Sequence, residues 1–305
     1  MFRPLLLTAA FGYALSQQLP NFYVHDVELI QMSRALREAD DNKARPGQVY
    51  LNYQGQAEGN QDNAPREFFY YVDPSLLQKP SFSQLIAMMN NFNPESGMDE
   101  PRVSPQEEAY EISTFLTTIL ASRPWQILYS FLYHKGHPFA QSPYTFRAWI
   151  EQLWFKHYSR SRGWADDTSA FEHVFMGEEK RGEVAGLHNW VRFYLLERNP
   201  AEQLNYMGFI EERGNVMVTL RFAWQGLLKR IGSFLVGTSP EFDMALYTLC
   251  FLSRRGTQCP VEIDGCSVII TSYDMVQDGQ IYIGTVYPDA GMLTSTCGNF
   301  YAHGF

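Results

Sequence analysis

Apolar residues in the first half of the chain recur at helical spacing. Leu29, Met32 and Leu36 lie three or four residues apart within 27–37, as on one face of a helix. Ser104, followed by a proline and by Glu107 three positions on, forms a capping box that predicts a helix from 105 to 120. The same spacing predicts three more helices, at 82–90 with Ser81 as N-cap, 124–133 and 145–158.

The second half mixes both periodicities. Helices are predicted at 187–197 and, after Ser239-Pro240, at 241–252, while 216–223 alternates like a strand. The turn Asp278-Gly279 predicts a hairpin between 267–273 and 280–287. We therefore expect an α+β fold, with a mainly helical lobe at about 22–165 and a catalytic α+β lobe with antiparallel strands at about 166–305.

The first sixteen residues read as a signal peptide. Arg3 precedes an apolar stretch at 5–15, and Ala14 and Ser16 form a small-x-small cleavage site. A buried first helix is the alternative interpretation. We expect the mature chain to begin near Gln17 and to be secreted, with no membrane span, because no later apolar segment is long enough to cross a bilayer.

All four cysteines lie late in the chain, at Cys250, Cys259, Cys266 and Cys297. They fit an oxidising compartment and allow three complete pairings, among which the sequence does not choose. Cys250 lies in an apolar helical run, so a free core thiol is a further possibility. No CxxC pair occurs, which argues against a zinc site.

The net charge of −9 is unusual for a protein that binds nucleic acid. Residues 173–230, however, carry eight Lys and Arg against seven Asp and Glu, so the negative charge lies elsewhere. Any RNA site is expected to be a local cationic patch on an acidic body.

Two histidines in this segment are candidates for chemistry. His173 and His188 lie fifteen residues apart beside glycines, and two imidazoles can serve as acid and base near neutral pH. Lys229 is a candidate for stabilising charge on phosphorus. The histidines could instead be structural, or they could form a metal site with Glu172 and Glu178.

Several ordered motifs resemble the EndoU family of uridylate-specific endoribonucleases. The central match covers 171–178 and 186–190, and it continues at 237–242, 245–248 and 282–288. Weaker similarity extends the match to nearly the whole of 17–305, without somatomedin-B-like repeats. The resemblance implies a catalytic triad of His173, His188 and Lys229.

The resemblance also suggests how a base is bound. Ser233 matches a serine that contacts uracil in the more distant coronavirus enzymes, Tyr287 matches an aromatic residue that packs on the base or ribose, and Thr285 is their neighbour. Glu172 and Glu178 match acidic positions of the family, where they bind metal or orient a histidine.

The implied reaction is transesterification of single-stranded, uridine-containing RNA. His188 takes the proton of the ribose 2′-OH, His173 protonates the leaving 5′-oxygen, and a 2′,3′-cyclic phosphate remains. The two histidine roles could be exchanged. We expect Mn²⁺ to stimulate the enzyme, DNA to be inert and the protein to be a monomer. The alternatives are a secreted RNA- or protein-binding protein without turnover, and a phosphodiesterase that uses metal-activated water.

Overall fold

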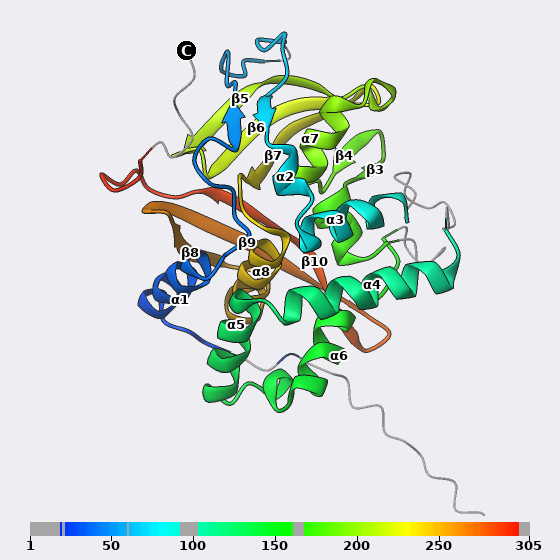
Figure 1. Ribbon diagram of the computed structural model, residues 1–305, viewed down its shortest axis with the longest axis vertical. Coiled ribbons are helices and arrows are strands. Elements are labelled where there is room, and N and C mark those ends of the chain that lie inside the picture. The colour runs from blue at the N-terminus through cyan, green and yellow to red at the C-terminus, as the bar shows by residue number, and fades with distance from the viewer. Residues whose placement is uncertain (1–18, 20–21, 60, 92–102, 161–167, 299–305) are drawn as a thin grey trace, which may run out of the picture.

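A computed structural model describes residues 19, 22–59, 61–91, 103–160 and 168–298. The predicted signal peptide at 1–16 lies outside these residues. The described part contains helices and antiparallel sheets, which confirms the expected α+β class (Figure 1). Within it, no helix combines the length and apolar character that crossing a membrane requires.

Two three-stranded antiparallel sheets form the second half of the chain, with strand orders β5-β6-β7 and β10-β9-β8. Two smaller sheets pair β1 with β2 and β3 with β4. The strands are β1 (Val49–Leu51), β2 (Phe69–Val72), β3 (Glu178–Lys180), β4 (Glu183–Ala185), β5 (Asn205–Arg213), β6 (Met217–Trp224), β7 (Leu227–Leu235), β8 (Gln258–Ile263), β9 (Cys266–Gln277) and β10 (Gln280–Ala290).

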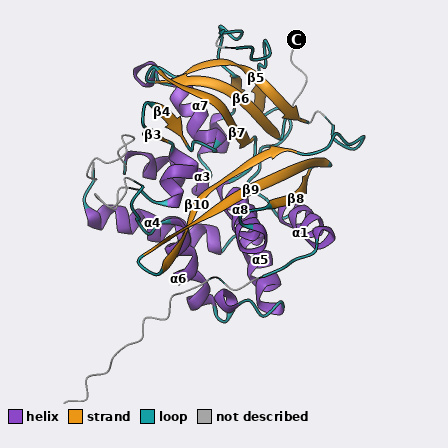
Figure 2. Ribbon diagram, turned by 180° about the vertical axis from the view of Figure 1, so that it is seen from behind, coloured by secondary structure: helices purple, strands orange, loops and turns teal. Residues whose placement is uncertain are grey.

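Helices pack against one face of the β10-β9-β8 sheet (Figure 2). Helix α8 is buried at all of its 15 positions and contacts β9, while α1 contacts β8. The helices are α1 (Asp26–Glu38), α2 (Pro74–Leu77), α3 (Pro80–Ala87), α4 (Pro105–Leu120), α5 (Arg123–His134), α6 (Pro143–Trp154), α7 (Trp190–Arg198) and α8 (Pro240–Arg254), with single turns at η1 (Met88–Asn90), η2 (Pro138–Ala140), η3 (Glu172–Met176) and η4 (Pro200–Glu202). Because α1 packs on a strand from the far end of the chain, distant segments share one core; the lobe boundary near 165 stays a prediction.

Proline and serine signals located the helix starts well, with two exceptions. Ser104 and Ser239 accept hydrogen bonds from backbone amides three residues on, as expected of N-caps. The expectation for Ser81 was wrong, because Pro80 takes the first helical position and Lys79 is the N-cap. Helix α7 begins at Trp190 instead of 187, because Leu187 has a left-handed φ of 62° that no helix accommodates.

Of the described strands, only β6, β9 and β10 were predicted; β1 to β4, β5, β7 and β8 were not. Strand β5 carries two register shifts against β6, and Gly208 within it has a φ of 125°, so its apolar residues do not alternate. The sequence around Lys229 did not predict strand β7, because only the last residues of this strand are buried and no alternation marks the rest. The hairpin of β9 and β10 is confirmed and is longer than expected at both ends.

Both disulfides lie near the β10-β9-β8 sheet. Cys250 of α8 is bonded to Cys259 of β8, and Cys266 at the start of β9 is bonded to Cys297 after β10. The possibility that Cys250 is a free thiol was therefore wrong: β8 brings a second cysteine against the buried face of α8. The two bonds tie the sheet to its covering helix and to the chain that leaves it.

Removing the longer-range disulfide should destabilise the fold more than removing the other. The Cys266–Cys297 bond closes a separation of 31 residues and the Cys250–Cys259 bond one of 9. On chain-entropy grounds, a Cys266→Ala/Cys297→Ala variant should lose about 3–4 kcal/mol of unfolding free energy, and a Cys250→Ala/Cys259→Ala variant about 2–3 kcal/mol. Urea denaturation of both variants measures this; the reverse order would show that buried packing, rather than loop closure, decides the loss.

Candidate active site

His173 lies on a short π-type turn between two tightly turning segments. Its backbone amide bonds the Ser169 carbonyl at 3.1 Å, and η3 ends at Gly177, whose φ is 81°. Glycine adopts a positive φ at little cost because it has no Cβ, so Gly177 allows the chain to reverse into β3. The turn thereby points the His173 side chain toward β10.

His188 is held beside His173 by backbone contacts. The amides of Leu187 and His188 donate to the carbonyls of His173 and Val174, at 3.0 and 2.6 Å. Gly186 lies so close that a Cβ on it would be 1.7 Å from the His173 carbonyl oxygen, and its φ is 65°. No other residue fits there, which explains why glycine precedes the second histidine.

The His173 ring has a partner at each nitrogen. Nδ1 lies 2.8 Å from Glu178 Oε1, and Nε2 lies 3.1 Å from Thr285 Oγ1. With Nδ1 protonated and donating to the carboxylate, Nε2 accepts from the threonine hydroxyl. The ring is therefore oriented from β3 on one side and from β10 on the other.

The His188 ring is oriented by β7 and covered by β10. Its Nδ1 donates to the backbone carbonyl of Ser233 at 2.8 Å, so Nε2 keeps its lone pair. The ring stacks on Tyr287, with centroids 5.3 Å apart and planes at 28°. Two strands from different sheets thus fix one imidazole.

Lys229 is the cation shared by the two histidines. It lies on β7 opposite Phe222 of β6, and its positive charge contributes to lowering the pKa of both rings. Burial lowers the Lys229 pKa to about 8, against the opposing effect of Glu178 and Glu183. The lysine is therefore still mainly charged at neutral pH.

Burial keeps both imidazoles neutral. It lowers the His173 pKa to about 4, assisted by Arg160 and opposed by the Glu178 hydrogen bond and charge. It lowers the His188 pKa well below its usual value, with Lys229 acting in the same direction and the Ser233 carbonyl opposing. Burial also works to raise the Glu178 pKa, but the hydrogen bond and charge of His173, together with nearby cations, outweigh it and lower this pKa to about 2.

The structure thus brings the six expected catalytic and substrate-binding residues into one place. Thr285 and Tyr287 on β10 contact His173 and His188 respectively. Ser233 of β7 is buried, and it is its carbonyl that contacts His188. Lys229 lies four positions earlier on the same strand.

Arg160 also belongs to this group, although nothing in the sequence marked it. Its guanidinium lies 3.4 Å from Glu178 Oε1 and donates to the Tyr158 hydroxyl. After burial, its charge is the largest contribution that lowers the His173 pKa. Arg160 reaches Glu178 because the segment 157–160 folds against β3, and no local sequence motif predicts such a contact.

The suggested metal set of Glu172, His173, Glu178 and His188 is divided by the fold. Glu178 turns to His173, whereas Glu172 turns away to His157 Nε2, which lies 3.1 Å from it and 3.6 Å from Glu108. One ligand atom from each of Glu108, His157 and Glu172 lies within 4.8 Å of the others. The sequence could not show this cluster, because Glu108 comes from α4, far along the chain.

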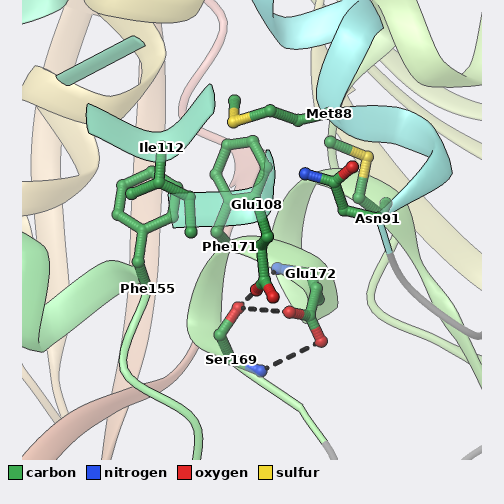
Figure 3. A pocket seen from close by; sticks show the side chains of 9 residues that line it. Met88, Asn91, Glu108, Ile112, Phe155, Ser169, Phe171 and Glu172 are labelled. Carbon is green, nitrogen blue, oxygen red and sulfur yellow. Dashed lines mark hydrogen bonds between the residues drawn. The ribbon is translucent and has the colours of Figure 1, made fainter. Parts of the chain in front are cut away.

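A small pocket borders this cluster (Figure 3). Ser169 bonds Glu172 through both its amide and its hydroxyl, which fixes the carboxylate. Asn91 lines the same pocket; its Nδ2 donates to Glu111, and its buried Oδ1 has no partner among the described residues. The two carboxylates and the imidazole of the cluster form a donor set that suits a divalent ion such as Mn²⁺.

Comparisons with known proteins agree over most of the chain. A Mus musculus protein named uridylate-specific endoribonuclease is 36% identical over 272 residues, which cover 85% of this chain and 65% of the relative. A Xenopus tropicalis protein named poly(U)-specific endoribonuclease is 35% identical over 281 residues, which cover 86% and 92%. The chain thus spans somewhat less than two thirds of the mouse relative.

A solved structure agrees as well. It is described as the structure of XendoU, a splicing independent snoRNA processing endoribonuclease, and it aligns with a TM-score of 0.72 at 31% identity, over 88% of this chain and 98% of that one. The model of the Endoribonuclease XendoU family matches residues 28–288. The chain belongs to the XendoU endoribonuclease family.

Proposed function

We propose that the protein is a uridylate-specific endoribonuclease that cleaves single-stranded RNA by attack of the ribose 2′-OH, leaving a 2′,3′-cyclic phosphate. The observation that carries the proposal is the pair of oriented imidazoles beside one buried lysine. Two imidazoles can serve as base and acid, and a lysine can stabilise negative charge, around one phosphodiester. The names of the relatives in the family support uridine as the base at the cut.

His188 is the base in this mechanism. Its Nδ1–H is committed to the Ser233 carbonyl, so Nε2 is free to accept the 2′-OH proton. Burial and the neighbouring Lys229 keep the ring unprotonated before the substrate binds. The deprotonated 2′-oxygen then attacks the adjacent phosphorus, and the P–O5′ bond breaks.

His173 is the acid. Its Nδ1–H donates to Glu178, which remains ionised and stabilises an imidazolium. In the free protein, burial holds its pKa at about 4. The negative charge of a bound phosphodiester raises that pKa, so His173 takes up a proton as the substrate enters and delivers it from Nε2 to the leaving 5′-oxygen. Lys229 stabilises the charge that develops on the phosphoryl oxygens.

Uracil is bound between β7 and β10. Ser233 supplies hydrogen bonds to the base edge, Tyr287 packs on the base or ribose, and Thr285 positions the acid. Reading a base by its edge and face requires it to be unpaired, so single-stranded RNA is the substrate. DNA lacks the 2′-OH nucleophile and is inert.

The alternative is an RNA- or protein-binding protein that has the fold but no turnover. The hydrogen bonds of His173 and His188 argue for catalysis, because each ring is oriented through Nδ1, and the Nε2 atoms contact only the Thr285 hydroxyl, at His173, or no hydrogen-bond partner among the described residues, at His188. A nuclease assay on one uridine-containing oligonucleotide separates the two functions.

Mn²⁺ is the stimulating cofactor in this proposal, held by Glu108, His157 and Glu172. When bound there, the ion supplies positive charge that compensates two closely spaced carboxylates. Glu172 directly precedes His173 on η3, so an ion held by Glu108, His157 and Glu172 would supply positive charge that orders the turn carrying the acid. The proposal also includes secretion and a monomer that starts near Gln17; the two disulfides support secretion.

Replacing any triad member should abolish most cleavage while the fold persists. His173→Ala, His188→Ala and Lys229→Ala should each lower kcat by about 10²- to 10⁴-fold, because each removes a group that acts on the reacting atoms. The exposed His134 of α5 provides a matched control, His134→Ala, that should cleave like the wild type. Circular dichroism checks folding, and a folded variant with wild-type turnover would remove that residue from the triad.

The product distinguishes transesterification from metal-activated hydrolysis. An oligonucleotide with 2′-deoxyuridine at the cut should bind and remain intact, since it lacks the nucleophile, whereas the uridine substrate should yield a 2′,3′-cyclic phosphate. Mass spectrometry of the fragments identifies the ends. Rapid cleavage at 2′-deoxyuridine, or a linear phosphate as the first product, would favour an attacking water.

The metal assignment can be tested by binding alone. Glu108→Gln keeps the shape of the side chain and removes one carboxylate, so Mn²⁺ affinity should fall at least about tenfold. Glu107→Gln, one residue earlier and exposed, is the matched control. Titration of Mn²⁺ followed by electron paramagnetic resonance measures both variants, and equal affinities would place the ion elsewhere.

A further inference from the structure

Three buried carboxylates lie where the end of α1 meets the start of α8 (Figure 1). Asp40 directly follows the C-cap of α1, and Glu241 and Asp243 lie in the first turn of α8. Their exposed fractions are 1%, 2% and 0%, respectively. Asp40 joins the two helices, because its Oδ2 accepts a hydrogen bond at 3.2 Å from the backbone amide of Ser239, the N-cap of α8. Carboxylates are rarely buried unless they are paired, so this group needs an explanation that neither the proposed active site nor the metal cluster supplies.

The nearby cations compensate only part of this negative charge. Arg37 pairs with Asp40 at 3.1 Å, but it also pairs with Asp264 at 2.6 Å. The charge of Lys79 acts on Asp40, but its ammonium donates to backbone carbonyls and not to a carboxylate. In the described part of the chain, neither cation forms an ion pair with Asp243. At least one of the three carboxylates therefore has no cationic partner.

Asp243 also lacks the hydrogen-bond donors that an ionised carboxylate needs. Among the described residues, neither of its side-chain oxygens has a partner at hydrogen-bonding geometry, although the Thr238 hydroxyl lies beside it. One oxygen of Asp40, one of Glu241 and the Tyr247 hydroxyl, one turn along α8, are unpartnered as well. A buried charge without partners is strongly unfavourable, whereas a protonated carboxyl is neutral and itself donates one hydrogen bond. Protonation would therefore remove a charge and give one of these acceptors a donor.

A bound metal ion is the other way to compensate buried carboxylates. It requires ligand atoms that converge around one point. Among the His, Cys, Asp and Glu side chains that the structure describes, such convergence occurs at Glu108, His157 and Glu172 and not at the start of α8. The geometry at the start of α8 therefore favours a proton over an ion.

The electrostatics of the cluster agree with this assignment. Burial raises the pKa of Asp243 well above its ordinary value, opposed by the Thr238 hydrogen bond and the Arg37 charge and assisted by the charges of Asp40 and Glu241. Burial also raises the pKa of Asp40 to about 6, against the charge of Arg37. The folded protein thus holds a proton in this group at pH values where the unfolded chain releases it.

We propose that Asp243 is a neutral carboxylic acid at neutral pH and that its proton acts as a pH-sensitive latch between α1 and α8. When the proton is lost, Asp243 and Asp40 are both negative in a buried space, and their repulsion loosens the contact between the helices. The latch adjoins the segment of His188, because the Thr238 carbonyl accepts a hydrogen bond at 2.8 Å from the indole of Trp190, two residues after that histidine. The inference does not depend on the proposed nuclease activity.

The latch links the stability of the fold to pH. Because the pKa of Asp243 is raised in the folded state, the folded protein binds the proton over a range in which the unfolded chain does not. Its contribution to the unfolding free energy is complete below the unfolded-state pKa and is lost as the pH rises through the folded-state pKa.

The test compares Asp243→Asn with the wild type by urea denaturation between about pH 5 and pH 8. Asparagine resembles the neutral acid and cannot ionise. Relative to the wild type, the folding equilibrium constant of the variant should therefore rise about tenfold for each pH unit, the effect of one proton. Asp41→Asn is the matched control, because the adjacent Asp41 side chain is 63% exposed; its stability relative to the wild type should not change with pH.

A second measurement detects the proton in the wild type itself. Carbon NMR of protein labelled at the aspartate carboxyl carbons should show an aspartate that is still neutral near pH 7, and Asp243→Asn should lack this signal. A stability difference between Asp243→Asn and the wild type that stays constant with pH, or the absence of a neutral aspartate from the wild type, would overturn the latch. Stabilisation of the wild type by added Ca²⁺ or Mn²⁺ that Asp243→Asn lacks would show an ion in place of the proton and would overturn it as well.

Discussion

One backbone contact determines the arrangement of the site: the approach of Gly186 to the carbonyl of His173. A single added carbon at Gly186 would overlap that carbonyl, so the contact exists only with glycine. The amides of the next two residues then bond the carbonyls of His173 and Val174, which joins the two histidine segments side by side. Because these bonds are between main-chain atoms, the relative position of the rings does not depend on flexible side chains.

The second constraint is electrostatic. Two imidazoles, Lys229 and Arg160 lie in the same region, where the Glu178 carboxylate pairs with His173 and Arg160 and its charge acts on Lys229. Burial and the neighbouring cations keep both imidazoles neutral. In the proposed mechanism, a bound phosphodiester raises the pKa of His173 alone, while His188 stays unprotonated as the base. Residues 173–230 carry eight Lys and Arg against seven Asp and Glu, so most of the negative charge of the chain lies outside the segment that holds the two histidines and Lys229.

The β5-β6-β7 and β10-β9-β8 sheets meet at the two histidines, and each sheet contributes different groups to the site. Strand β7 provides the lysine and the carbonyl that orients His188, and β10 provides Thr285 and Tyr287. Helix α8 packs against β8 and β9, and the disulfides join β8 to α8 and the start of β9 to the chain after β10. These contacts support the hairpin whose β10 strand carries Thr285 and Tyr287. Glu172 and His173 are consecutive on η3 but contact different groups, so one short turn connects the proposed active site with the candidate metal cluster.

The sequence by itself determined the helices with serine or proline at their starts, the hairpin at Asp278-Gly279 and, through ordered motifs, the residues that meet in the site. These are local signals: a cap, a turn or a short motif is complete within a few residues. The tertiary structure alone decided the bulged strand β5, the pairing of Cys250 with Cys259, the place of Arg160 beside Glu178 and the meeting of Glu108, His157 and Glu172. Each of these depends on contacts between segments distant in the chain, where packing, and no spacing along the sequence, selects the partner.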